Sequence, residues 1–351
     1  PTPQRPWALR QRRQGFGRPS PHAVVPLNAP PHAPRRCAAP RAVPESASTG
    51  TGRPRSTTPI PMSDITVPTF LPLAERARLA QARRLTTPCG DGELVWHAWG
   101  EPRAGVPPLV LFHGGSGSWT HWVKNILPLV DAGRSVWAVD LPGFGDSGPP
   151  TGGSDADAMV APLAASLRQL MGDEPVDLVG FSFGGMTAGL LLAAHPQLAR
   201  RLVLVGAPAM GVVPGRQFEL KAWRHLKTPQ EQADIHRHNL GVLMLHDHDL
   251  IDGLALEVHI ANVQRDRLPR RRLAHTDILA RSLPQVPCPV HTIYGAHDAI
   301  YRQYIHQLED AFAAAAPAFR GMQLIEGAGH WVQFEAPEAF DAALERALSS
   351  A

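Results

Sequence analysis

The feature that most constrains the fold is a regular alternation of short apolar segments with longer amphipathic ones. From Leu85 onward, apolar runs typical of buried strands are separated by segments whose apolar residues recur with helical spacing. A parallel sheet covered by helices produces this alternation, because each connection between parallel strands must cross the sheet. The sequence therefore predicts an α/β fold, with a mostly parallel central sheet and helices on both faces.

The predicted elements extend through most of the chain. Strands are predicted at residues 93–99, 108–112, 135–140, 176–181, 201–207, 290–294 and 322–326. Helices are predicted at residues 121–130, 156–171, 184–195, 303–316 and 337–348. Glycines end several of the apolar runs, as Gly114 and Gly115 do after the strand at residues 108–112.

Residues 208–288 interrupt the alternation. They contain no buried-strand run, and helices are predicted there at residues 216–225, 229–245, 250–261 and 270–282. Because the stretch lies between predicted core strands, we interpret it as an inserted helical cap. It divides the sheet domain into residues 62–207 and 289–351. Ligands of open α/β sheets bind outside the carboxyl ends of the strands, where we expect the cap to lie.

The first 61 residues have a different composition. They contain 14 of the 36 prolines, ten arginines and a single acid, Glu45, which gives a net charge of +9 against −6 for the remainder. Prolines remove backbone donors, and the apolar residues have neither helical nor strand spacing, so this segment is predicted to be disordered. Three explanations stay open: a start placed too early, upstream of Met62; a native disordered arm; and an organelle transit peptide.

Charge and cysteine content exclude several classes of partner. The net charge of the whole chain is +3, but the residues after position 61 carry a net charge of −6. This negative charge disfavours binding to the phosphates of nucleic acid. No run of 18 apolar residues occurs, which argues against a membrane span. The three cysteines, Cys37, Cys89 and Cys288, cannot build a disulfide framework, which favours a cytoplasmic location. We expect a monomer or homodimer that acts on a small molecule.

The most specific chemical motif is Gly-Phe-Ser-Phe-Gly at residues 180–184, followed by Gly185. It lies between a predicted buried strand and a predicted helix, the setting of a nucleophile elbow. Such a turn strains the serine backbone, requires small neighbouring residues and exposes the hydroxyl. Ser182 is therefore the candidate nucleophile. The alternative is a glycine-rich packing turn around a chemically inert serine.

A serine hydroxyl is a weak nucleophile unless a base accepts its proton. His330 lies in a glycine-rich loop directly after the last predicted strand, and Asp298 follows the strand before it. This gives the order Ser, Asp, His that accompanies the elbow, with Asp298 orienting the imidazole. His297 as the base and Asp277 as the acid stay open as alternatives.

A third motif follows the strand at residues 108–112. Its sequence, His-Gly-Gly-Ser-Gly-Ser-Trp at residues 113–119, is suited to donate a backbone N–H to a developing oxyanion. We expect that donor to be Gly115 or Ser116, acting together with the N–H of Phe183. His113 is expected to be a structural hydrogen-bonding residue.

Other residues near these motifs are candidates for the substrate pocket and for metal binding. Trp119, Phe181 and Trp331 are predicted to form an apolar pocket. Arg265 and Arg271 are candidates to bind a substrate carboxylate, although such arginines also occur on solvated helix faces. His-x-His pairs at 236/238 and 246/248 would point to different faces of a helix. We therefore expect no metal. The sequence has no glycine-rich loop of the kind that binds phosphate after a first strand, so we expect no nucleotide or other cofactor.

Together with Asp-Leu-Pro-Gly-Phe-Gly-Asp-Ser at residues 140–147, these motifs resemble the α/β-hydrolase superfamily over about residues 85–350. The sequence of residues 329–335 and the helical insertion resemble hydrolases that cleave carbon–carbon bonds in aromatic ring-fission products, and related ester and amide hydrolases. That branch usually has Gly-Gly-Gly-Pro-Gly where residues 114–118 are Gly-Gly-Ser-Gly-Ser. It usually has Asn-Ser-Met where residues 181–183 are Phe-Ser-Phe.

The resemblance implies that an ester, amide or similar carbonyl compound is hydrolysed through an acyl-enzyme on Ser182. Two alternatives stay open. One is carbon–carbon bond hydrolysis of vinylogous diketo acids, for which the leaving group is a carbanion. The other is a catalytically slow ligand receptor built on the same fold.

Overall fold

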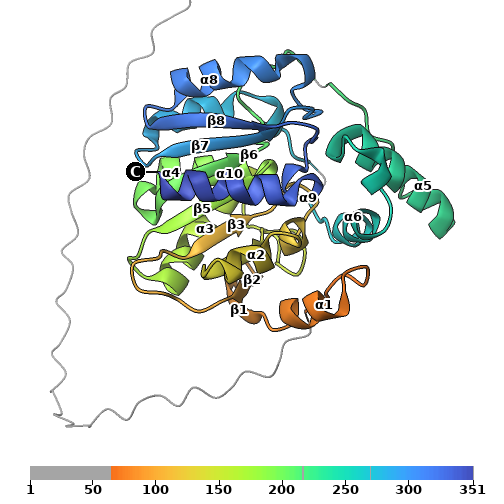
Figure 1. Ribbon diagram of the computed structural model, residues 1–351, viewed down its shortest axis with the longest axis horizontal. Helices are drawn as coiled ribbons and strands as arrows, with labels where there is room; N and C mark the ends of the chain where they lie inside the picture. Colours follow the sequence, from red (N-terminus) through yellow and green to blue (C-terminus); the bar gives the residue numbers. More distant parts are fainter. Residues whose placement is uncertain (1–64, 216, 269, 351) are drawn as a thin grey trace, which may run out of the picture. The chain divides into compact units, whose positions relative to one another are not determined.

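The computed structural model of this chain describes residues 65–215, 217–268 and 270–350 (Figure 1). The predictions made for residues 1–61, and Cys37 among them, fall outside these ranges. Within the described residues, no helix combines the length and apolar character needed to cross a bilayer.

In the part of the chain that the structure describes, eight strands form one sheet in the order β1-β2-β4-β3-β5-β6-β7-β8. Their bounds are β1 Arg83–Cys89, β2 Gly92–Trp99, β3 Leu109–Phe112, β4 Val136–Asp140, β5 Val176–Phe181, β6 Ala199–Val205, β7 Val290–Gly295 and β8 Phe319–Ile325. The pairs β1–β2 and β2–β4 are antiparallel and all others are parallel, which confirms the predicted fold class. Strand β1 was missed because it is a half-exposed edge strand with no continuous apolar run.

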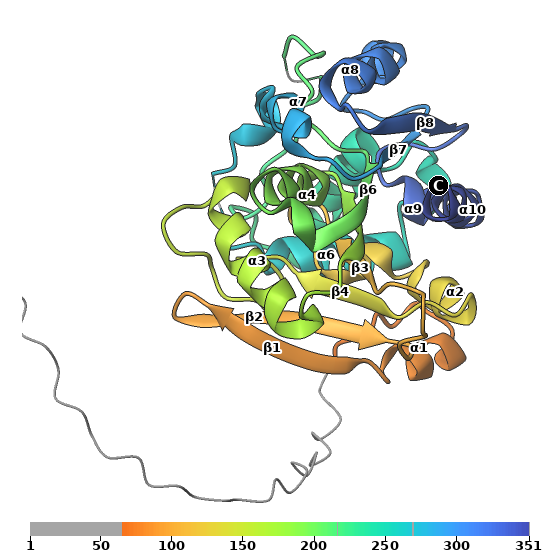
Figure 2. The same ribbon diagram turned by 90° about the vertical axis from the view of Figure 1, so that its left-hand side faces the viewer.

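Helices cover both faces of the sheet (Figure 2). Helices α3 (Ala156–Met171), α4 (Phe183–Ala194), α7 (Ile278–Ser282) and α8 (Leu308–Ala315) contribute to one core. Helices α1 (Leu73–Leu79), α2 (Ile126–Asp131) and α10 (Pro337–Ser349) contribute to the other.

Strand β3 illustrates why the central strands are continuously apolar. Val110 and Phe112 face the first core, and Leu109 and Leu111 face the second. All four side chains are fully buried. Because successive side chains of a strand point to opposite faces, a strand covered on both sides needs an apolar residue at every position.

The inserted stretch, residues 208–288, is less helical than predicted. It contains α5 (Pro229–Asn239), α6 (Leu254–Gln264) and the short α7. The predicted helix at 216–225 is wrong: its described residues are not helical, and the N–H and carbonyl of Lys221 bind the amide of Asn239 instead. The predicted helix at 270–282 forms only in part, since the N–H groups of Arg272 and Leu273 donate to the carboxylate of Asp155.

Helices α5 and α6 lie beyond one end of the sheet (Figure 1). In the segment after α6, the N–H of Arg267 donates to the carbonyl of Gly143, in the loop that follows β4. The side chain of Asn262 on α6 accepts hydrogen bonds from the loop that follows β3. The insertion therefore contacts the carboxyl ends of the strands.

Asp341 on α10 gives the fold a predicted pH dependence. Its carboxylate accepts a hydrogen bond of 2.9 Å from Asn125. Burial nevertheless raises the pKa of Asp341 from 3.8 to about 7, because the charged form is poorly solvated. The unfolded chain therefore loses this proton at lower pH than the folded chain, so stability falls as pH rises from about 4 to about 7. We expect Asp341→Asn to raise the melting temperature more at pH 8 than at pH 4.

The measurement is thermal unfolding of both proteins at the two pH values. Asp310→Asn, at an exposed acid of α8, is the matched control and should show no such difference. An equal gain from Asp341→Asn at pH 4 and pH 8 would contradict the assignment.

Candidate active site

Ser182 occupies a sharp turn between β5 and α4. Its backbone has φ 51° and ψ −119°, in the region that L-residues rarely adopt. The N–H of Ser182 donates to the carbonyl of Val205 on the neighbouring strand at 2.7 Å. The predicted strained elbow is therefore present in the fold.

Glycines make this turn sterically feasible. A Cβ atom at Gly184 would lie 2.4 Å from the carbonyl oxygen of His113, and one at Gly180 would lie 2.6 Å from Cα of Gly185. Both contacts involve backbone atoms that cannot move aside. Glycine at these positions thus lets α4 start directly against β3 and β5.

The structure brings the side chains of Ser182, His330 and Asp298 together. Nε2 of His330 lies 2.9 Å from Oγ of Ser182, and Nδ1 lies 2.8 Å from Oδ2 of Asp298. The other carboxylate oxygen of Asp298 accepts the N–H of Ile300 at 2.9 Å. His330 is 2% exposed and Asp298 is fully buried. This arrangement fixes which way the imidazole faces.

The two alternative residues make other contacts. Asp277 forms an exposed ion pair with Arg281 in the inserted stretch. The ring of His297 stacks on that of His246, with 3.8 Å between centroids. Among the described residues, it is therefore Asp298 and His330 whose contacts connect to Ser182.

A half-buried carboxylate fixes the loop that carries His330. The carboxylate of Glu335 accepts the N–H of Gly329 at 2.6 Å, and those of His246 and Asp247 at 2.7 and 2.5 Å. Burial raises the pKa of Glu335, and these hydrogen bonds oppose the rise. Glu335 thus joins the His330 loop to the inserted stretch. The sequence points to Glu335 only within residues 329–335 and predicts no role for it. No local pattern reveals its contacts with residues 246 and 247, which are far away in the chain.

Two neutral histidines hold the peptide groups of Gly114. Nδ1–H of His113 donates to the carbonyl of Gly114 at 2.7 Å, while Nε2 accepts the N–H of Leu141 at 2.8 Å. Nδ1 of His121 accepts the N–H of Gly114 at 3.2 Å. Burial lowers the pKa of His113 to about 4 and that of His121 well below its usual value. His121 was missed because its position in the predicted helix gave no sign of this contact.

The loop that follows β3 runs beside the elbow. A Cβ atom at Gly114 would lie 3.3 Å from Cβ of Ser182, and one at Gly115 would lie 3.6 Å from Cβ of Phe183. Phe183 is the first residue of α4, so its N–H has no acceptor within the helix. The helix terminus also carries partial positive charge. The expected oxyanion donors Gly115, Ser116 and Phe183 therefore lie on neighbouring segments.

The three aromatic pocket candidates are buried. The ring of Phe181 lies 5.1 Å from that of His330, centroid to centroid. The indole N–H of Trp331 donates to the carbonyl of His121, and its ring stacks on Phe334. The ring of Trp119 packs on Trp99. All three residues belong to the core between the sheet and α2 and α10.

The two arginine candidates are both ion-paired. Arg265 pairs with Asp146 at 2.9 Å. Arg271 pairs with Asp266 at 2.8 Å and donates to Oγ of Ser116 at 3.0 Å. The Arg271 guanidinium also lies over the ring of Phe183, 5.6 Å from its centroid. Of the two, only Arg271 touches the loop after β3.

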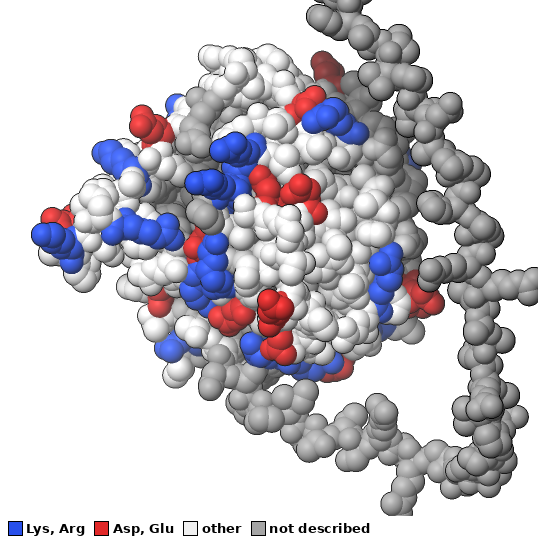
Figure 3. Space-filling model, turned by 180° about the vertical axis from the view of Figure 1, so that it is seen from behind, with Lys and Arg blue, Asp and Glu red and all other residues white. Residues whose placement is uncertain are grey.

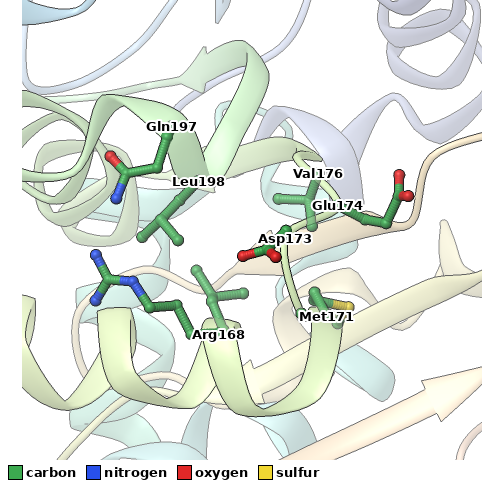
Figure 4. Close-up of a pocket in the computed structure, with 9 residues that line it drawn as sticks. Arg168, Met171, Asp173, Glu174, Val176, Gln197 and Leu198 are labelled. Atoms are coloured by element: carbon green, nitrogen blue, oxygen red, sulfur yellow. The ribbon is translucent and has the colours of Figure 1, made fainter.

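Two cavities lie at opposite ends of the sheet. One of about 310 Å³ borders His330 and is lined by Val242, His246, His248, His297, Arg302 and Gly329 among others. The other, of about 270 Å³, is surrounded by side chains that include Arg168, Asp173 and Gln197 (Figure 4). It is bordered by Val176, the first residue of β5, whereas Ser182 follows the last. Of these two cavities in the described residues, the first adjoins the candidate site.

One face of the molecule carries charged side chains of both signs. On the face seen in Figure 3, basic side chains lie beside acidic ones. Within the described ranges, no three His, Cys, Asp or Glu residues are grouped so that they could hold a metal ion. His236 instead packs its ring against Trp223 and His259.

Known proteins resemble this chain in sequence and fold. A 2-hydroxy-6-oxononadienedioate/2-hydroxy-6-oxononatrienedioate hydrolase of Cupriavidus pinatubonensis is 26% identical over 274 residues, which cover 74% of this chain and 92% of the relative. A pimeloyl-acyl-carrier-protein methyl ester esterase of Neisseria meningitidis is 28% identical over 227 residues, covering 58% and 81%. The crystal structure of an esterase from Rhodococcus sp. ECU1013 superposes with a TM-score of 0.63 at 23% identity, covering 77% and 98%.

The family comparison covers most of the described chain. Residues 109–343 match the alpha/beta hydrolase family, and this range includes Ser182, Asp298 and His330. The mostly parallel eight-stranded sheet agrees with that match. The chain therefore belongs to the alpha/beta hydrolase family and is a hydrolase.

Proposed function

We propose that this protein hydrolyses carboxylic esters of small molecules through Ser182, His330 and Asp298. The observation that carries the proposal is the continuous contact from Oγ of Ser182 through the imidazole of His330 to the carboxylate of Asp298, at 2.9 and 2.8 Å. Both distances are those of hydrogen bonds. The bond between Ser182 and His330 can pass a proton from hydroxyl to imidazole, and the bond to Asp298 orients the ring.

In the first step, Oγ of Ser182 attacks the ester carbonyl carbon while Nε2 of His330 accepts the hydroxyl proton. Asp298 accepts the Nδ1–H of His330 and stabilises the imidazolium that forms. The carbonyl oxygen becomes an oxyanion that accepts N–H bonds from Phe183 and from Gly115 or Ser116. His330 then protonates the departing alkoxide. Water, activated by the same imidazole, releases the acid from Ser182.

The ion pairs of the two arginine candidates favour an ester over an anionic diketo acid. Arg271, which contacts the loop after β3, is already neutralised by its ion pair with Asp266. Arg265 is neutralised in the same way by Asp146. An arginine with a carboxylate partner gains less from binding a second carboxylate than an unpaired one. Cleavage of a carbon–carbon bond is the second candidate, because relatives that span most of this chain are named as hydrolases of 2-hydroxy-6-oxononadienedioate and 2-hydroxy-6-oxononatrienedioate, compounds without an ester bond.

A substrate panel tests the choice. Purified protein is assayed with p-nitrophenyl esters of increasing acyl length, with the matching anilides, and with a vinylogous 1,5-diketo acid whose absorbance falls on cleavage. We expect steady turnover of the esters, and kcat/KM higher than for either other class. A higher kcat/KM for the diketo acid would replace the proposal with the second candidate. A single burst of p-nitrophenol without steady turnover would favour a ligand receptor.

A further inference from the structure

The inserted stretch forms hydrogen bonds with the loop that follows β3 through three polar side chains, those of Asn262, Asp266 and Arg271. We call these three side chains the clasp. The hydroxyl of Ser116 donates to Oδ2 of Asp266 at 2.5 Å and accepts from Arg271 at 3.0 Å. Asp266 and Arg271 are also paired with each other, so Ser116 joins a closed set of three polar groups. Their side chains are 12% and 21% exposed, which shields the contacts from water.

Asn262 makes a second contact with the same loop. Its Oδ1 accepts the hydroxyl of Ser118 at 2.7 Å and that of Thr120 at 3.2 Å. Asn262 is fully buried although it belongs to α6 of the inserted stretch. The clasp therefore reaches the loop at both Ser116 and Ser118.

Ser116 needs an external contact because its backbone is strained. Its φ is 51°, in the left-handed region where the Cβ of an L-residue crowds the backbone. Ser116 can relax by rotating the peptide group that joins it to Gly115. In that rotation the N–H of Ser116 would turn away from its present direction. The carbonyl of Gly115 would turn towards the position that the N–H had occupied.

We propose that Asp266 and Arg271 are positioning residues that hold Ser116 in its left-handed conformation and thereby keep the peptide of Gly115 and Ser116 directed at the oxyanion. Asn262 anchors the other end of the loop. The inserted stretch then does more than cover the site. The loop after β3 can present its N–H to the oxyanion only while the clasp is bound to it. This inference rests on the proposed function and adds the source of its oxyanion geometry.

Two substitutions at Ser116 separate the role of the hydroxyl from that of the strain. Ser116→Ala removes the hydroxyl and keeps the Cβ, whereas Ser116→Gly removes both. Glycine adopts positive φ without strain, so the loop needs no clasp in that variant. We expect kcat on a p-nitrophenyl ester to be about tenfold lower for Ser116→Ala than for Ser116→Gly, with little change in KM. The affinity of a trifluoromethyl ketone, whose adduct fills the oxyanion hole, should fall in parallel.

Asp266→Ala tests the same contact from the inserted stretch. In the otherwise native chain it should lower kcat about tenfold, and in the Ser116→Gly background less than about threefold. Asp146→Ala is the matched control, because it breaks the Arg265 ion pair between the same stretch and another loop of the core. We expect Asp146→Ala to leave kcat near the native value.

Labelling of Ser182 by a fluorophosphonate distinguishes failure of the proposed function from failure of the clasp proposal alone. If the native chain is not labelled at Ser182, the proposed function and the clasp are both overturned. If all variants are labelled but Ser116→Ala and Ser116→Gly have equal kcat, only the clasp is overturned. A loss from Asp266→Ala that is the same in both backgrounds would also overturn it. Should Asp266→Ala not fold, the two Ser116 variants decide the question.

Discussion

Replacing Ser182 with alanine is expected to lower kcat by up to about a millionfold, to a rate set by binding and the oxyanion donors alone. The change removes one hydroxyl at a position whose backbone is fixed by the N–H bond to Val205 and by close packing of α4. The fold should therefore persist. The measurement is kcat on the best ester of the panel, with melting temperature and circular dichroism as checks on folding.

A matched control is Ser349→Ala, which removes an exposed hydroxyl at the end of α10 and should keep native turnover. A fluorophosphonate should label the native chain at Ser182 and leave the Ser182→Ala variant unlabelled. Native turnover in Ser182→Ala, or labelling at a different serine, would exclude covalent catalysis by this residue.

Asp298→Asn is the second substitution with a large expected effect, about a ten-thousandfold fall in kcat. The amide has the shape of the carboxylate, but its NH₂ group would donate to Nδ1 of His330. The imidazole proton would then move to Nε2, which could no longer accept the proton of Ser182. Both the orientation and the protonation of His330 thus depend on a carboxylate at this position, which lies 2.8 Å from Nδ1.

The control is Asp277→Asn, which tests the other acid suggested by the sequence. Asp277 is paired with Arg281 on the surface, so its loss should change kcat little. If Asp277→Asn abolished turnover and Asp298→Asn did not, Asp277 would be the orienting acid and the proposed site would be wrong. Fluorophosphonate labelling of Asp298→Asn should be slow, because it needs the same proton transfer.

Local sequence predicted most elements of the sheet domain, although it missed β1. The strand at residues 176–181 and the helix at residues 156–171 have the bounds found in the structure. Such segments are determined by their own periodicity, because a strand buried on both faces must be apolar throughout and a helix on the sheet must be apolar on one face. The sequence also located Ser182, since a strand, a tight glycine turn and a helix are contiguous in the chain.

Local sequence was a poorer guide to the inserted stretch. Residues 217–225 have enough good helix formers to suggest a helix, but the contact between Lys221 and Asn239 takes the backbone groups that a helix would use. Propensity is a weak term that such tertiary contacts override. The same holds for residues 270–282, where Asp155 from the core binds two N–H groups.

By itself, the sequence determined the alternating architecture, the strained elbow at Ser182 and the order of the candidate acid and base. These follow from side-chain periodicity and turn chemistry, which act between residues close together in the chain. Only the tertiary structure decided that Asp298 and His330 reach Ser182, that His121 and Glu335 hold the loops around it, and that Asp266 and Arg271 grip Ser116. Such contacts join residues far apart in sequence, and they form only when the strands align their carboxyl ends and the insertion folds over them.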